Sequence, residues 1–287
     1  MNTAVSTLRS LLILGRVSNL PTVWSNCMAG WWLSGGGELW SLLLLGAGGT
    51  CLYVGGMYLN DAFDAQFDWQ HRPERPIPSG AIHASMVWIL GFSWLGIGLG
   101  CLAVFGKATM ICAVLLAVAI LIYDAMHKIF EFSPLLMAAC RFLLILVASS
   151  TAREGITGLS VWTALVMASY IVGLSYIART ESTLVALRYW PCVFLAAPLV
   201  LALVINRGEY QLRAVSLSAV ITLWSLRSLT FALWSRQRNV GRCVASLLAA
   251  IPLLDLLSIW DGSFLLAVIF VGLFVVALLL QRFVPAT

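Results

Sequence analysis

Four polar side chains in a largely apolar region, Asn60, Asp61, Asp64 and Asp68, have the types and spacing that metal-dependent chemistry needs. On a helix they would lie within about 100° of one another, because a helix completes a turn every 3.6 residues. Carboxylates packed this closely repel one another, and a hard divalent cation removes that cost. Magnesium prefers oxygen ligands and commonly joins one or two carboxylates to the phosphate oxygens of a substrate. The pattern therefore predicts a magnesium-binding helix face.

A proline-rich segment with two arginines, Arg72 and Arg75, follows the acidic residues directly. Arginine binds phosphate oxygens through pairs of N–H groups, and proline stiffens the backbone of a loop. Two arginines beside three carboxylates suit a complex of metal and diphosphate. We expect the intervening Phe63 and Phe67 to point away from the acidic face. The alternative interpretation is a solvated acidic helix end that binds nothing.

The two segments together resemble a known motif. Asn-Asp-x-x-Asp-x-x-x-Asp at 60–68, followed by Arg-Pro-x-Arg-Pro-Ile-Pro-Ser-Gly at 72–80, is similar to the first aspartate-rich motif of the UbiA superfamily of intramembrane aromatic prenyltransferases. The resemblance implies that a prenyl diphosphate loses its diphosphate and that an acceptor attacks the resulting allylic carbocation. The implied site residues are the magnesium ligands Asp61, Asp64 and Asp68, supported by Asn60, and the diphosphate ligands Arg72 and Arg75.

A second polar segment, Tyr123-Asp124-Ala-Met-His127-Lys128, ends another apolar run. Many members of the superfamily have Tyr-Pro-x-x-Lys-Arg here, and that basic pair approaches the diphosphate. In this chain His127 and Lys128 replace the pair, and Asp124 stands where proline is usual. The resemblance implies that Lys128, together with His127, neutralises the leaving group and that Tyr123 and Asp124 lie in the substrate site. The alternative is that Lys128 only anchors a cytoplasmic loop.

The third segment, Ser175-Tyr176-Ile-Ala-Arg179-Thr-Glu181-Ser-Thr, departs from the superfamily pattern. A second aspartate-rich motif is expected here, but Glu181 is the only carboxylate, and Arg179 lies beside it, with Tyr176 one turn earlier. Two explanations compete. In the first, Glu181 is an unusual metal ligand and Arg179 substitutes for a cation. In the second, the protein uses a single metal cluster or no longer performs the usual transfer. The Tyr-x-Ala-Arg-x-Glu signature resembles a divergent branch that includes proteins of ebo-type gene clusters.

Five other polar residues are informative. Arg16 and Asn19 begin the first long apolar run, close to where the superfamily holds a diphosphate or acceptor contact, although an arginine at this position is often a membrane anchor. Arg141, Arg227 and Asp255 lie inside apolar runs, where charges are costly and are usually paired or functional. The sequence does not identify their partners.

The elements that position these residues are predicted to be membrane-spanning helices. Of 287 residues, 61% are apolar and only 10% are charged, whereas soluble domains contain about 25% charged residues. Each span needs about 20 residues, and the alternation typical of a β-barrel is absent. We expect one domain over residues 1–287, an all-α, polytopic, UbiA-like bundle of nine to ten spans. The apolar runs are 17–35, 39–59, 83–105, 108–123, 134–151, 160–178, 189–206, 213–234, 242–260 and 263–281.

The basic residues predict the orientation of this integral membrane protein. With the N-terminus in the cytoplasm, eleven lysines and arginines of the loops face the cytoplasm and four face outward, as the positive-inside rule favours. The three polar segments then share the cytoplasmic side. The eleven are Arg9, Arg16, Arg72, Arg75, Lys128, Arg179, Arg188, Arg236, Arg238, Arg242 and Arg282; the four are Lys107, Arg153, Arg207 and Arg213.

Three functions remain compatible with the sequence. The first is magnesium-dependent transfer of a prenyl group from a prenyl diphosphate to an aromatic or other lipophilic acceptor. The second is a UbiA-like protein that binds a prenyl lipid without transferring it, and the third is a transporter. The expected partners are a prenyl diphosphate, an acceptor of unknown identity and membrane lipid, and the net charge of +5 is assigned to membrane loops rather than to nucleic-acid binding. Prenyl length, acceptor and oligomeric state do not follow from the sequence.

Overall fold

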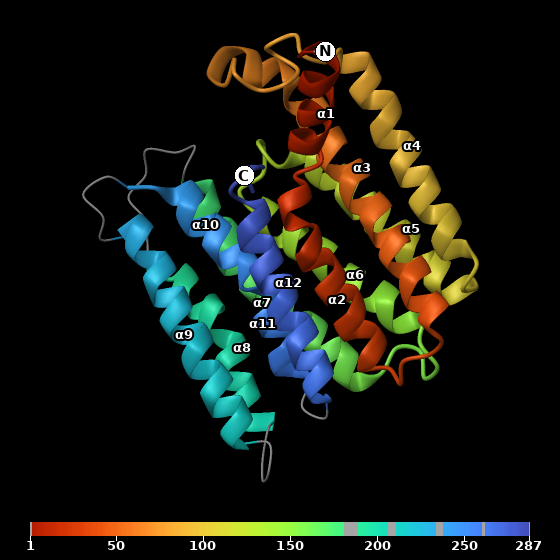
Figure 1. Ribbon diagram of the computed structural model, residues 1–287, viewed down its shortest axis with the longest axis vertical. Coiled ribbons are helices and arrows are strands. Elements are labelled where there is room, and N and C mark those ends of the chain that lie inside the picture. The colour runs from red at the N-terminus through yellow and green to blue at the C-terminus, as the bar shows by residue number, and fades with distance from the viewer. Residues whose placement is uncertain (1, 181–188, 206–210, 234–237, 260–261, 287) are drawn as a thin grey trace.

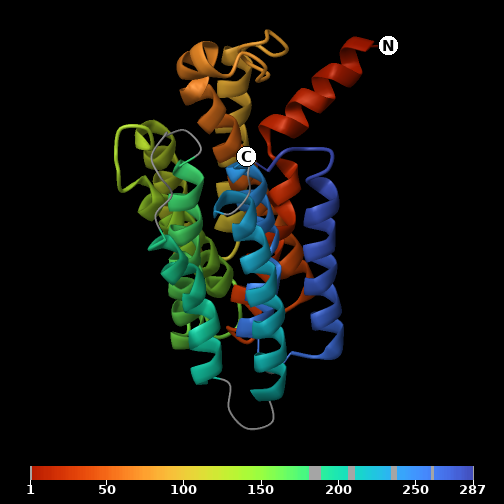
Figure 2. The ribbon, with the colours of Figure 1, turned by 90° about the vertical axis from the view of Figure 1, so that its left-hand side faces the viewer.

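The computed structural model describes residues 2–180, 189–205, 211–233, 238–259 and 262–286, and all regular structure in these ranges is helical, as predicted. The helices run roughly along one axis, and the chain passes back and forth between the two ends of the bundle (Figures 1 and 2). The elements are α1 Asn2–Leu14, η1 Val17–Asn19, α2 Leu20–Trp32, α3 Leu39–His71, α4 Ala84–Ala103, α5 Lys107–Met126, α6 Ser133–Ser150, α7 Gly158–Arg179, α8 Pro191–Ile205, α9 Gln211–Leu233, α10 Val240–Ala249, α11 Ile251–Ser258 and α12 Phe264–Leu280.

Seven helical segments among the described residues are long and apolar enough to span a membrane. They are α3, α4, α5, α6, α7, α9 and the combined α10–α11 segment. The remaining apolar runs of the described residues form the shorter helices α2, α8 and α12. A 3₁₀ turn precedes α2, which ends just before Gly35 and Gly36, whose φ values are +83° and +60°. Helix α8 continues through Pro198 to Ile205, where the described segment ends. Where nine to ten spans were expected, the described residues therefore provide seven candidates of full length.

Glycines allow α3 and α4 to pack closely, which fixes the helix that carries the acidic residues. A Cβ atom at Gly55 would lie 2.9 Å from the carbonyl oxygen of Gly91, and one at Gly98 would lie 3.0 Å from that of Gly48. Small residues that let two backbones approach are typical of helix pairs in membranes, where van der Waals packing drives association. The long α3 is thus held along α4 (Figure 1).

The loop after α3 folds back onto that helix and carries Arg75 with it. Ile77 and Ile82 are each 6% exposed and join an apolar cluster with Tyr58 of α3. A backbone hydrogen bond of 3.2 Å from the Ile82 N–H to the Pro76 carbonyl closes the loop. Burial of these two isoleucines explains why the proline-rich segment returns to the acidic helix.

Most of the described basic residues lie at one end of the bundle. Arg75, Lys128 and Arg179 follow helices that end there, whereas Lys107 and Arg153 lie at the opposite end, where α4 leads into α5 and α6 into α7 (Figure 1). The three polar segments of the sequence therefore share one end of the bundle. Arg188, Arg207 and Arg236 lie outside the described residues.

Candidate active site

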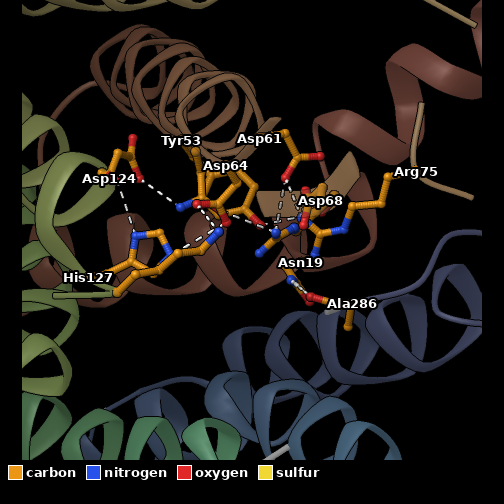
Figure 3. Close-up of polar contacts among 12 residues, drawn as sticks. Asn19, Tyr53, Asp61, Asp64, Asp68, Arg75, Asp124, His127 and Ala286 are labelled. Carbon is orange, nitrogen blue, oxygen red and sulfur yellow. Dashed lines mark hydrogen bonds and ion pairs between the residues drawn. The ribbon is translucent and has the colours of Figure 1, made fainter. Parts of the chain in front are cut away.

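A cavity of about 500 Å³ opens at this end of the bundle and is lined by residues of α3, α5, α6, α7 and α10. Asp64 and Asp68 line it, and Asp61 lies on the same helix face behind them, with all three side chains buried (Figure 3). A helical α3 therefore presents the three carboxylates as one group. Arg72 also lines the cavity and forms no ion pair with any of the described residues.

Arg75 joins two of the three carboxylates. Its Nη1 lies 2.8 Å from Oδ2 of Asp68 and 3.4 Å from Oδ1 of Asp61 (Figure 3). The side chain of Arg75 is 16% exposed and lines the cavity. The folded-back loop thus delivers a guanidinium that neutralises the acidic face and still reaches the cavity.

Arg16 approaches the same face from the turn between α1 and α2. Its Nη2 lies 3.3 Å from both the Asn60 Oδ1 and the Asp61 Oδ1 atoms. Burial acts to lower the pKa of Arg16, but Asp61 and neighbouring groups more than offset this effect, so the pKa lies above its usual value. Among the described residues, Arg16 is the only non-glycine with positive φ, at 41°, a conformation that costs roughly 1–2 kcal/mol. The contacts with α3 stabilise this strained backbone.

Asp64 is paired with the end of α5. The Lys128 Nζ atom lies 2.7 Å from Asp64 Oδ1, and the His127 Nε2 atom lies 3.5 Å from Asp64 Oδ2. Lys128 also lies over the ring of Phe67, 3.8 Å from its centroid. The expectation that Phe67 points away from the acidic face is wrong. Phe67 follows Asn60 by seven residues, close to two full turns, and therefore shares its face.

Asp124 connects α5 to α3 rather than opening into the main cavity. Its Oδ1 accepts a hydrogen bond of 3.1 Å from Asn60 Nδ2, and its Oδ2 is buried with no hydrogen-bond partner among the described residues. The Tyr123 ring lines the cavity and stacks on His127 at 5.0 Å. The aspartate that replaces the usual proline therefore braces Asn60, and the neighbouring tyrosine braces His127.

Asn19 contributes to both the cavity wall and the chain end. Its Nδ2 donates a hydrogen bond of 2.9 Å to the carbonyl oxygen of Ala286, which also lines the cavity (Figure 3). This contact between η1 and the C-terminal segment was not predicted, because Asn19 and Ala286 are separated by almost the whole chain.

The residues of the atypical third segment take different positions. Arg179 lines the cavity, but its Nη1 donates to the carbonyl oxygens of Phe130 at 3.0 Å and Glu131 at 2.6 Å. Tyr176 packs edge-on against Trp190 at 4.6 Å and is not among the described residues that line the cavity. Glu181 lies outside the described residues. Arg179 thus ties α7 to the loop between α5 and α6.

Two of the interior charges form one buried network. Arg141, 9% exposed, donates to Asn26 Oδ1 at 2.8 Å and to Thr22 Oγ1 at 2.9 Å. Asn26 Nδ2 in turn donates to both carboxylate oxygens of Asp255, at 3.0 and 2.8 Å. The amide relays between the two charges and satisfies both. Arg141 lines the cavity about 12 Å along α6 from Ser133, eight residues earlier.

The donor set suits magnesium, although it is not a preformed metal cage. No three His, Cys, Asp or Glu side chains among the described residues converge as metal ligands. The candidate donors on α3 are all oxygen atoms, and the Asp64 and Asp68 carboxylates face a cavity where phosphate oxygens of a substrate could complete the coordination. The residues present therefore fit a magnesium ion that arrives with an oxyanion, and Asp61, Asp64 and Asp68 would hold it.

The fold and the cavity define a class: a polytopic membrane protein with paired carboxylates and cations around a pocket at one end of its helices. The chain belongs to the UbiA prenyltransferase family, because the sequence model of that family matches residues 19–286. It is thus a prenyltransferase-family enzyme and an integral membrane protein with seven candidate spans.

Solved structures with a similar fold include UbiA homologs from two archaea. The apo structure of a homolog from Aeropyrum pernix K1 has a TM-score of 0.67 and 14% identity, covering 87% of this chain and 98% of the other. A homolog from Archaeoglobus fulgidus bound to GPP and Mg²⁺ has a TM-score of 0.62 and 12% identity, covering 96% and 97%. These TM-scores show a shared fold.

Curated relatives match shorter stretches of the chain. A digeranylgeranylglyceryl phosphate synthase from Metallosphaera sedula is 34% identical over 70 residues, which cover 24% of this chain and 25% of the relative. One from Methanoregula boonei is 30% identical over 125 residues, covering 42% and 43%. The matched regions thus span less than half the length of these relatives.

Proposed function

We propose that this protein transfers a prenyl group from a prenyl diphosphate to a lipophilic acceptor within the membrane, with the help of Mg²⁺. The observation that carries the proposal is the cavity in which paired carboxylates of α3 meet cations from three other parts of the chain. Membership of the UbiA family and the ligands of the Archaeoglobus fulgidus homolog, GPP and Mg²⁺, support it.

Charge exchange explains why the site would bind a magnesium diphosphate. Asp64 is paired with Lys128, and Asp68 with Arg75. A bound magnesium ion would neutralise carboxylates and phosphate oxygens together and stabilise the charge on the leaving diphosphate. The cations would then turn to phosphate oxygens, which guanidinium groups bind in a bidentate way. Binding thus replaces each ion pair instead of exposing an uncompensated charge.

The same cations would assist departure of the diphosphate. As the bond between C1 of the prenyl group and oxygen breaks, its electron pair goes to the diphosphate, and Lys128, Arg75 and Arg72 stabilise the growing negative charge. We assign supporting roles to His127, Arg16 and Asn60. His127 contacts Asp64, and Arg16 contacts both Asp61 and Asn60. The acceptor then supplies the electron pair for the new bond to C1 and loses a proton.

The prenyl tail and the acceptor need apolar room beside the charged end. A narrower apolar pocket of about 80 Å³ extends between α2, α3, α5 and α6. It shares five described residues with the main cavity: Tyr53, Met57, Tyr123, Met137 and Arg141. We assign the tail to this extension and the acceptor to the side of the main cavity that Asn19 lines. Asp124, Tyr176, Arg179 and Glu181 stay in the proposal as further substrate-site residues, and Asp124 acts through Asn60.

The membrane arrangement completes the proposal. We place the N-terminus and the active-site end in the cytoplasm, because the described basic residues favour that end. We also propose nine to ten passes, in which the shorter helices α2, α8 and α12 cross beside the seven full-length candidates. The atypical segment around Arg179 supports a position in a divergent, ebo-type branch of the family.

Diphosphate release from purified protein in lipid nanodiscs tests the function. The protein is incubated with Mg²⁺ and prenyl diphosphates of increasing length, with and without aromatic acceptors. We expect Asp64→Asn to lower release by two orders of magnitude or more, the size typical for loss of an electrostatic catalytic group. Glu74→Gln is the matched control, because Glu74 is exposed and lies outside the cavity lining. Equal activity of Asp64→Asn and the wild type would exclude the assigned role.

A further inference from the structure

A second groove of about 510 Å³ lies on the other side of the bundle, between α9, α10 and the end of α12. Three arginines, Arg227, Arg242 and Arg282, line it and come from three separate elements. We call it the arginine groove. It is distinct from the active-site cavity, and Ala286 of the C-terminal segment is the one described residue that lines both.

The three guanidinium groups have no anionic partner among the described residues. All three side chains are exposed, and none takes part in an ion pair in the described part of the chain. Asp255 of the adjoining helix α11 is fully buried and is bound by Asn26. Like charges that line one groove with no counter-ion among the described residues form a favourable site for an anion.

The walls of the groove are braced. The Trp224 Nε1–H donates a hydrogen bond of 2.9 Å to the Ser246 carbonyl, which joins α9 to α10. The Gln281 side chain donates one of 2.9 Å to the Ala245 carbonyl, which joins the end of α12 to α10. The spacing of the arginines is therefore fixed by contacts that do not use the guanidinium groups themselves.

Aromatic rings hold two of the arginines by their faces. The Arg242 guanidinium lies 4.3 Å from the Phe231 ring centroid, and that of Arg227 lies 5.8 Å from Trp224. Stacking on a ring occupies the face of a guanidinium and leaves its N–H edge available. That edge is the part that binds phosphate oxygens in a bidentate way.

The groove lies at the end of the bundle where α9 and α12 end and α10 begins. Arg227 is six residues before the end of α9, about 9 Å along the helix, whereas Arg242 begins α10 and Arg282 follows α12. This places an apolar and aromatic floor below and basic side chains above. Basic pockets between membrane helices on the cytoplasmic side are typical binding sites for anionic lipid head groups.

We propose that the arginine groove binds the phosphate of an anionic membrane phospholipid. The head group lies between Arg227, Arg242 and Arg282, and the acyl chains run down beside α9 and α12. Phosphate is the shared chemistry of a lipid head group and of free inorganic phosphate. The open groove beside apolar helices favours the lipid, because only the lipid also fills the apolar surface below the arginines.

Lipid retention provides the test and needs no prenyl diphosphate, so its outcome is independent of the transfer reaction. Delipidated full-length protein is mixed with equal amounts of phosphatidylglycerol and phosphatidylcholine that carry the same acyl chains, and the bound lipids are counted by native mass spectrometry. The double variant Arg242→Gln/Arg282→Gln is compared with Arg9→Gln/Arg238→Gln. The latter removes the same charge at exposed positions of the same end outside the groove.

We expect the wild type and the control to prefer phosphatidylglycerol, and the groove variant to lose this preference by on the order of thirtyfold. An equal loss in both double variants would overturn the proposal, since it would reflect general attraction to the surface. Indifference of the wild type to the two lipids would also overturn it, and this result does not depend on the folding of any variant. Displacement of the lipid by equimolar inorganic phosphate would refute the choice of lipid over free anion.

Discussion

Lys128→Gln is the substitution that best separates catalysis from stability at this site. The side chain keeps most of its length and polarity but loses the charge that lies 2.7 Å from Asp64 Oδ1. His127 remains near the same carboxylate at 3.5 Å, so the ion-pair network is weakened and not emptied. The position over the Phe67 ring stays accessible to the glutamine amide.

The expected effects on stability and on catalysis differ in size. The Lys128 side chain is 34% exposed, so solvent screens its pair with Asp64, and the loss of folding stability should be about 1 kcal/mol or less. In the reaction the same ammonium would face charge that develops on the diphosphate. Removing one such electrostatic contact typically costs about 2.7–4 kcal/mol. Since each 1.36 kcal/mol is a factor of ten, diphosphate release should slow about a hundredfold or more.

The assay measures single-turnover diphosphate release in nanodiscs and thermal unfolding in the same preparation. Lys107→Gln is the control, because Lys107 is exposed at the opposite end of the same helix, α5. Lys128→Arg keeps the charge and should retain most of the rate. Lys107→Gln removes the same charge as Lys128→Gln but away from the site, and Lys128→Arg keeps the charge at the site.

Two results would refute the reasoning. A wild-type rate in Lys128→Gln would show that the ammonium does not act on the leaving group. A rate loss in Lys128→Arg as large as that in Lys128→Gln would show that packing over Phe67, and not charge, is what matters.

Three further predictions address the metal, the buried network and the helix packing. Chelation with EDTA should abolish diphosphate release, and added Mg²⁺ should restore it; persistent release would argue against the metal. Arg141→Met should destabilise the protein by about 3–5 kcal/mol, because Asp255 loses its compensating charge, and Arg141→Met/Asp255→Leu should recover part of this in chemical unfolding. Gly55→Ala should destabilise by about 1–3 kcal/mol, since its Cβ would lie 2.9 Å from the Gly91 carbonyl oxygen. Gly46→Ala, on the same helix with open space around the Cβ, should not lower the thermal unfolding midpoint.

Local patterns predicted the helical class and the acidic face because both depend on residues close in sequence. The spacing of Asp61, Asp64 and Asp68 needs only the period of one helix. The same period places Phe67 on the face of Asn60, so the expectation that Phe67 points away from this face does not agree with a regular helix. Span lengths were predicted less well, because a 3₁₀ turn before α2 and the two glycines after it shorten this helix inside a run that remains apolar.

Contacts between distant helices could not be predicted from one sequence. Arg141 and Asn26 are separated by 115 positions, and Asn26 and Asp255 by 229. Their apolar surroundings indicated only that each charge needs a partner. The contact between Asn19 and Ala286 is also a contact between distant segments, because it depends on how η1 and the C-terminal segment meet in three dimensions.

The balance of charge around the cavity bears on the question that the atypical third segment raised. Six arginines and lysines among the described residues line the cavity beside the three carboxylates of α3: Arg16, Arg72, Arg75, Lys128, Arg141 and Arg179. Where a second acidic motif would add carboxylates, α7 supplies Arg179, whose guanidinium binds the carbonyl oxygens of the loop between α5 and α6. A diphosphate offsets the excess of cations directly, so it needs fewer metal ions than a site with two acidic motifs. Within the proposed function, we therefore infer a single metal cluster on α3, with Arg179 bracing the α7 side of the cavity. Glu181, the alternative ligand of a second magnesium, lies outside the described residues.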